Sequence, residues 1–223
     1  MLEDLLKYFG IIARVLMILS LLLWAIYSKK WPESFRKLGP VLIINMIIEI
    51  ASYSLSYFKI PNLFLLHLYT LLEFLAWTYF FDTLFKSNDW WQKWRFPFAA
   101  GVSILILLNT IFLESVNIFN SNAKTLSHII LISYCMVFFY QSFGTKDLND
   151  PVQKGTTFLS FGILLYYLGS LFVFMFSNYH TVFWKSPVSQ RAFWVINAFL
   201  TIIFQLIMLR SLWIVAHQRQ NLS

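Results

Sequence analysis

The chain has 223 residues, of which 59% are hydrophobic and 12% charged, and its mean hydropathy is +0.66. A soluble domain carries about half apolar and about a quarter charged residues, so a water-soluble globular fold is excluded. The formal net charge is +7, but the basic residues lie in short connections between apolar runs and accompany no readout motif. The expected partner is therefore the lipid bilayer and not nucleic acid.

Seven apolar runs follow one another along the chain, each long enough to cross about 30 Å of hydrocarbon as a helix of about 20 residues. They predict an all-α polytopic membrane helix bundle that forms one transmembrane domain over residues 1–223. The first run is followed by Ser28, Lys29 and Lys30 and not by a small-residue cleavage site, so we expect it to remain as a helix. The predicted spans are 8–27, 38–58, 62–81, 96–113, 126–143, 157–176 and 192–209.

The basic residues are distributed unevenly between the two sets of connections. They are more numerous after the first, third, fifth and seventh runs than in the remaining connections, where Lys124 is counted as a loop residue. The positive-inside rule then predicts an N-terminus outside and a C-terminus in the cytoplasm. Trp90, Trp91 and Trp94 lie among charged residues after the third run, as expected for rings at the headgroup level.

Among the ionisable residues inside the predicted spans, four stand out: Arg14, Glu49, His67 and Glu73. A charge at the centre of a spanning helix costs roughly 2.5–3.5 kcal/mol on insertion scales, so such residues are candidates for a functional site. Arg14 has two other interpretations that stay open. It can pair with one glutamate as a structural ion pair, or extend toward the headgroups.

Hydrogen-bonding side chains flank these charges at helical spacing. In the second run Asn45 lies four residues before Glu49, and in the third run Tyr69 lies four residues before Glu73, with Thr70 beside it. Residues four apart share one face of a helix, so these groups are expected to face the interior of the bundle.

The last predicted span carries Asn197, Thr201 and Gln205 at four-residue spacing. Such groups either hydrogen-bond a neighbouring helix, at about 0.6 kcal/mol each, or contact a ligand. Both interpretations stay open. In the sixth span, Gly162 and Gly169 are seven residues apart and are expected to permit close helix packing.

Cofactor binding is not determined by the sequence. His67 and His128 together with two glutamates contain enough donors for zinc, but their spacing does not support a site, and no metal ligand is assigned. The span 192–209 contains no lysine, which excludes retinal attached there as a Schiff base. The cofactor is therefore left unknown.

The third span reads His67-Leu68-Tyr69-Thr70-Leu71-Leu72-Glu73-Phe74, with Asn45 and Glu49 before it. This pattern resembles a group of seven-helix membrane proteins of Bacteroidota for which no function is settled. The resemblance implies a bacterial inner (cytoplasmic) membrane. Such proteins are similar in outline to membrane sensor modules, which favours sensing.

Three functions stay open. The first is a sensor or receptor-like module that binds a small or lipidic ligand in an intramembrane polar pocket and signals through a membrane or cytoplasmic partner. The alternative is a small-solute or proton-coupled transporter with Glu49 and Glu73 as proton carriers. An intramembrane enzyme is the further alternative. The candidate ligand-binding or proton-carrying residues are Arg14, Asn45, Glu49, His67, Tyr69, Thr70, Glu73, Asn197, Thr201 and Gln205.

Overall fold

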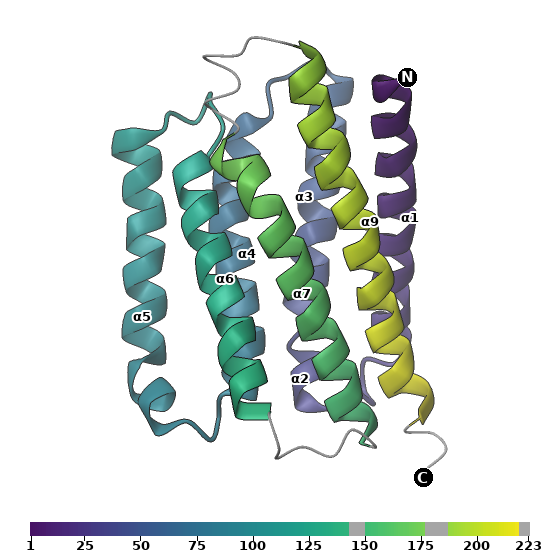
Figure 1. The fold of residues 1–223 in the computed structure, drawn as a ribbon, viewed down its shortest axis with the longest axis vertical. Helices are drawn as coiled ribbons and strands as arrows, with labels where there is room; N and C mark the ends of the chain where they lie inside the picture. Colours follow the sequence, from purple (N-terminus) through teal and green to yellow (C-terminus); the bar gives the residue numbers. More distant parts are fainter. Residues whose placement is uncertain (143–149, 177–186, 219–223) are drawn as a thin grey trace.

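The computed structural model describes residues 1–142, 150–176 and 187–218 of the chain. Seven helices in this part are long and apolar enough to cross a membrane, and they run side by side in one bundle (Figure 1). The predicted all-α membrane bundle is confirmed, and the chain is an integral membrane protein. The long helices are α1 (Leu2–Ile26), α3 (Gly39–Tyr57), α4 (Leu63–Leu84), α5 (Asp89–Leu108), α6 (Ser121–Ser142), α7 (Pro151–Met175) and α9 (Pro187–Gln218).

Several helices begin earlier than the apolar runs that predicted them. α5 begins at Asp89 and α6 at Ser121, whereas the runs begin at 96 and 126. The reason is that polar residues also form the first turns where a side chain satisfies the free backbone N–H groups. The side chain of Asn88 accepts the N–H of Trp91 at the start of α5. Residue 143, the end of the predicted fifth span, lies outside the described residues.

Two short elements adjoin the long helices. The one-turn helix α2 (Glu33–Arg36) precedes α3, and the π-helical turn η1 (Asn109–Leu113) continues α5. In the bundle, α9 packs between α1 and α7, α6 packs on α7, and α4 packs on α3, α5 and α6. Successive long helices alternate in direction, so the N-terminus and the end of α9 lie at opposite ends (Figure 1).

Glycines set the distance between α7 and α9. A Cβ atom on Gly162 would lie 2.5 Å from Cγ2 of Ile207, and one on Gly169 would lie 2.8 Å from Cδ1 of Leu200. Both distances are too short for real carbon contacts, so a larger residue would push the helices apart. The prediction that Gly162 and Gly169 permit close packing is confirmed.

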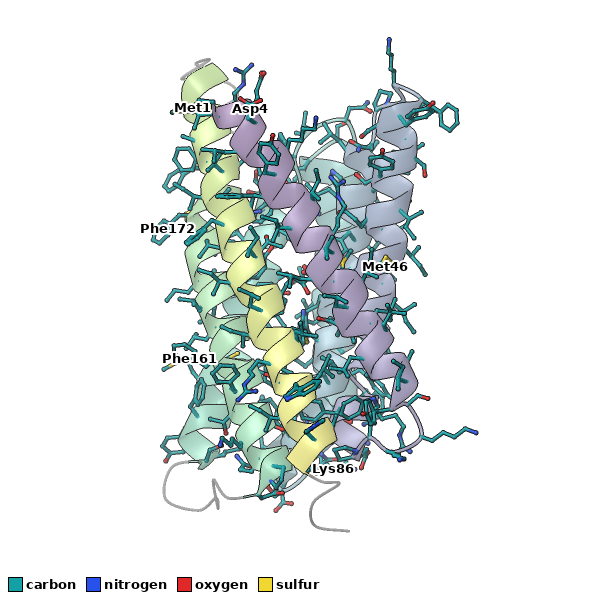
Figure 2. All side chains as sticks on the ribbon, turned by 90° about the vertical axis from the view of Figure 1, so that its right-hand side faces the viewer. Met1, Asp4, Met46, Lys86, Phe161 and Phe172 are labelled. Carbon is teal, nitrogen blue, oxygen red and sulfur yellow. The ribbon has the colours of Figure 1, made fainter. Side chains whose placement is uncertain are left out.

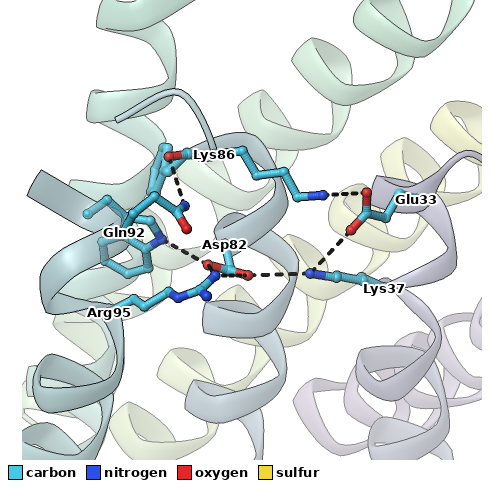
Figure 3. A network of polar contacts seen from close by, with 8 residues as sticks. Glu33, Lys37, Asp82, Lys86, Gln92 and Arg95 are labelled. Carbon is cyan, nitrogen blue, oxygen red and sulfur yellow. Dashed lines mark hydrogen bonds and ion pairs between the residues drawn. The ribbon is translucent and has the colours of Figure 1, made fainter. Parts of the chain in front are cut away.

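Asp82 of α4 holds a charged network at the end of the bundle opposite the N-terminus (Figure 3). Its carboxylate accepts Nη1 of Arg95 at 3.0 Å and Nε1 of Trp91 at 3.1 Å, both from α5. Trp91 is only 5% exposed and its indole N–H donates to Asp82, so this ring packs inside the protein and does not face the headgroups. Trp90 and Trp94 are exposed, as rings at the headgroup level require.

The same network reaches the start of α3 through α2. Lys37 lies 3.3 Å from Asp82 and 3.6 Å from Glu33, and Lys86 pairs with Glu33 (Figure 3). Together with Arg95 these contacts join α2, α4 and α5 at one end of the bundle, although Lys37 and Asp82 are 45 positions apart in the chain.

Candidate functional site

A fully buried ion pair lies between α4 and α6. Nζ of Lys124 donates to Oε2 of Glu73, and the two side chains are 2% and 3% exposed. The sequence-based placement of Lys124 in a loop is wrong. The polar residues before the fifth apolar run belong to α6, which begins at Ser121, so Lys124 is inside the helix and leaves the count of loop charges.

Two tyrosines complete the surroundings of Glu73. The hydroxyls of Tyr69 and Tyr167 donate to Oε1 of Glu73 at 2.7 and 2.8 Å, and the ammonium of Lys124 lies 4.3 Å from the ring centroid of Tyr69. Both carboxylate oxygens therefore have donors. This matters because an unpaired charge in a dry interior is strongly destabilising.

Asn45 of α3 extends this cluster. Its side-chain oxygen, Oδ1, lies 3.0 Å from the hydroxyl oxygen of Tyr69. A phenol has one proton, and the carboxylate of Glu73 is the stronger acceptor, so Tyr69 donates to Glu73. The NH₂ group of Asn45 then donates to the phenol oxygen. This requires only that the amide oxygen and nitrogen of Asn45 exchange places by rotation of the amide. Asn45, Tyr69 and Glu73 thus form one hydrogen-bonded chain.

A cavity of about 170 Å³ adjoins this chain of polar groups in the middle of the bundle. An apolar cavity of about 150 Å³ in another protein holds benzene, so this one has room for a group of about that size. Residues from α1, α3, α4, α7 and α9 contribute to its wall. The lining residues are Met17, Asn45, Ile48, Glu49, Tyr69, Glu73, Tyr166, Tyr167, Thr201, Phe204 and Gln205.

The cavity thus brings together part of the set of residues singled out from the sequence. Asn45 and Glu49 come from α3, Tyr69 and Glu73 from α4, and Thr201 and Gln205 from α9. These three helices were expected to present polar faces to the interior, and the shared cavity is where those faces meet. Lys124 and Tyr166 were not among the candidates, although Lys124 lies four residues before His128, at the spacing that continues a helix face.

Gln205 lines the cavity and carries a buried hydrogen-bond acceptor that is unused among the described residues. Its side chain is 5% exposed, and its Oε1 atom has no partner among the described residues. A buried acceptor without a partner costs about 1–3 kcal/mol. The neighbouring hydroxyl of Thr201 donates to the backbone oxygen of Asn197 at 2.9 Å, so it does not satisfy Gln205.

Arg14 and Glu49 form the ion pair that was one interpretation of the sequence. Nε of Arg14 lies 2.8 Å from Oε1 of Glu49, and both side chains are 41% exposed. Glu49 lines the central cavity, whereas Arg14 does not. The pair joins α1 to α3 at the edge of the site.

Besides Arg14, three further candidate residues lie outside the cavity. The ring of His67 contacts Oγ1 of Thr110 at 3.0 Å and the backbone oxygen of Ile118 at 3.2 Å. The hydroxyl of Thr70 donates back to the oxygen of Leu66 in its own helix. The side chain of Asn197 does not line the cavity. Residues on the same helix therefore make different contacts, because each side of the helix faces a different neighbour.

The two membrane-embedded histidines do not share a site. His128 lies 3.4 Å from the hydroxyl of Ser170 and packs edge-on against Tyr167, with ring centroids 4.8 Å apart, while His67 contacts η1 and the connection after it. Among the residues that the structure describes, no group of three or more His, Cys, Asp or Glu side chains lies close enough to hold a metal ion.

Glu114 fixes the start of the helix that carries Lys124. Its buried carboxylate accepts the backbone N–H groups of Ser121 and Asn122, at 3.1 and 3.0 Å, and the side-chain amide of Asn109 at 2.7 Å. A carboxylate at a helix N-terminus satisfies free donors and interacts favourably with the positive end of the helix dipole. Glu114 lies after an apolar run. It caps α6 only because the connection between η1 and α6 brings its side chain to the start of that helix.

Comparison of the chain with known protein families, with characterised proteins and with solved structures found no match. The class that the fold and the site define is a seven-helix integral membrane protein with a polar cavity inside the bundle.

Proposed function

We propose that the chain is a small sensor or receptor-like membrane module that binds a small or lipidic ligand in the central cavity and signals through a partner protein. The observation that carries this proposal is that Gln205, a residue of the cavity wall, has a buried Oε1 atom with no partner among the described residues. A ligand with a hydrogen-bond donor at this position removes the cost of the buried acceptor.

The charges around the cavity select an uncharged ligand. Glu49 and Glu73 are matched by Arg14 and Lys124, so the four charges sum to zero. A further charge at this depth would cost several kcal/mol. A hydroxyl or amide donor avoids that cost and still satisfies Gln205.

The signal passes to a membrane or cytoplasmic partner in this proposal. The described residues form helices and their connections, so a ligand-dependent shift reaches another protein through helix faces or connections. The resemblance of the third span to proteins of Bacteroidota supports a bacterial inner membrane as the location, with the N-terminus outside.

Native mass spectrometry of protein purified in mild detergent from its own membranes tests the proposal. We expect the wild-type protein to carry a bound organic molecule of defined mass. Gln205→Met removes the acceptor at similar volume, and we expect it to lower occupancy about tenfold, which corresponds to about 1.4 kcal/mol for one hydrogen bond.

Ser127→Ala is the matched control for that experiment. Ser127 is also buried, and its hydroxyl is unpaired within the described part of the chain, but it does not line the cavity, so its substitution leaves occupancy unchanged. A wild-type protein that carries no organic molecule, or equal occupancy in all three proteins, would contradict the proposal.

The Lys124–Glu73 pair favours a second candidate function, proton-coupled transport. An acid that lines a cavity and has a buried basic partner is a suitable place for a proton to exchange with a solute. A pH-sensitive dye inside reconstituted vesicles distinguishes the two functions. Proton flux that Glu73→Gln abolishes would favour the transporter, and absence of flux would favour the sensor.

A further inference from the structure

A second hollow of about 220 Å³ opens on the lipid-facing surface between α1 and α3. Its wall, the α1–α3 groove, consists of Arg14, Met17, Ile18, Met46, Glu49, Ile50 and Tyr53. Figure 2 views this side of the bundle, with α1 between α9 and α3 and Met46 at mid-height beside α1. Two of these residues, Met17 and Glu49, also line the central cavity, so they separate the groove from the cavity.

The ion pair in this groove lies at an unfavourable depth. Arg14 is midway along α1 and Glu49 is near the middle of α3, yet both side chains are 41% exposed. Around them, Ile18 and Ile50 are 44% and 58% exposed, as expected for side chains in contact with acyl chains. Half-exposed charges in hydrocarbon are costly, which favours an occupant that brings a polar group to this depth.

We propose that the ligand of the central cavity is a single-chain amphiphile with an uncharged, hydrogen-bond-donating head, such as a long-chain alcohol, and that it enters sideways from the bilayer. Its tail lies in the α1–α3 groove. Its head passes Met17 and Glu49 and donates to Oε1 of Gln205. This inference rests on the proposed function and adds the class of ligand and its route.

The two hollows together suit one such molecule. The groove is lined mainly by apolar side chains, and the cavity beside it carries the polar groups. Their combined volume of about 390 Å³ is within the range of small-molecule sites, roughly 300–1,000 Å³. The larger groove between α1 and α9, of about 570 Å³, shares no lining residue with the cavity and therefore does not lead to it.

The test uses hexadecan-1-ol with a mid-chain diazirine, added to the full-length protein in phosphatidylcholine vesicles and activated by light. We expect saturable labelling of the α1–α3 groove, mapped by peptide mass spectrometry and displaced by unlabelled hexadecan-1-ol. Ile18→Trp fills the groove at a surface position and should reduce this labelling about tenfold. Ile11→Trp is the matched control, because Ile11 is on the same helix, is also 44% exposed, and lines none of the three hollows.

Each outcome separates the inference from the proposed function. Labelling of the groove that falls in Ile18→Trp and in Gln205→Met, but not in Ile11→Trp, supports the inference. Labelling confined to the α1–α9 groove, or equal labelling in both tryptophan variants, overturns it. In that case the occupancy of the cavity in native mass spectra still decides the proposed function, because a small ligand without a tail needs no groove.

Discussion

Lys124 has no acidic residue in its own helix, and its partner Glu73 lies 51 positions earlier in the chain. The pair is dry, so its attraction is strong, but the cost of removing both charges from water is also large. The balance makes each residue dependent on the other. Loss of one partner leaves the other as an uncompensated buried charge.

A double-mutant cycle measures this dependence. We expect Lys124→Met to lower the free energy of unfolding by about 3–5 kcal/mol, since Glu73 then keeps only its tyrosine donors. The double variant Lys124→Met/Glu73→Gln should lose less than the sum of the two single variants. Unfolding in mixed detergent micelles, followed by tryptophan fluorescence, gives the three values. Additive losses would show that the two residues act independently.

Gln205 and Thr201 show how far a single residue can be interpreted from sequence. Their spacing indicated one polar face of the last helix, and both structural bonding and ligand contact stayed open as interpretations. The structure places both side chains in the cavity wall, yet only the hydroxyl of Thr201 bonds within its own helix, while Oε1 of Gln205 has no partner among the described residues. The spacing predicted the face, and the neighbouring helices determined which group remained unsatisfied.

At the scale of the element, α7 and α9 depend on glycine for their close approach. Gly155, Gly162 and Gly169 recur every seven residues on α7, and side chains of α9 occupy the space above each of them. Lipid provides no hydrophobic drive for helices to associate, so this close packing is a main source of their attraction.

Gly162→Ala tests that packing. The new methyl group would meet Ile207 at 2.5 Å, so we expect a loss of about 1–3 kcal/mol in the free energy of unfolding. Gly101→Ala in α5 is the control, since no atom of the described residues lies within 4 Å of its Cβ position and alanine favours helix over glycine. Thermal unfolding of both variants in detergent gives the comparison. A Gly162→Ala protein as stable as Gly101→Ala would refute the role of the glycine.

The boundaries of the elements were less predictable than their existence. Hydropathy identified each spanning helix, because about 20 apolar residues have few alternatives in a membrane. It did not include the polar first turns. At the start of α6 these turns contain Lys124, so an error of five residues in a boundary moved a residue of the site from the helix to a loop.

At the scale of the whole molecule, the end opposite the N-terminus carries the network of Asp82 with Lys37, Arg95 and neighbouring charges (Figure 3). The end of α9 lies on the same side (Figure 1). Basic residues near the ends of spanning helices favour the cytoplasm. Removal of Lys124 from the opposite set of loop charges strengthens this asymmetry.

Fusions at the C-terminus test the orientation. We expect a fluorescent protein that matures only in the cytoplasm to be bright after fusion there, and alkaline phosphatase, which needs oxidising conditions, to be inactive. The same reporters fused to the N-terminus are expected to behave in the opposite way. An active phosphatase at the C-terminus would reverse the predicted orientation.

The sequence by itself determined the class of molecule. A composition with 59% hydrophobic residues and apolar runs of spanning length has one physical outcome, a bundle of membrane helices, because lipid cannot satisfy a backbone in any open form. It also determined which faces of the helices are polar, since that depends only on spacing along one helix. Only the tertiary structure decided which of those faces meet. The partnership of Glu73 with Lys124, the separation of His67 from the cavity and the position of the α1–α3 groove beside the cavity all depend on contacts between helices far apart in the chain. Such contacts are set by packing across the whole bundle, and no local spacing records them.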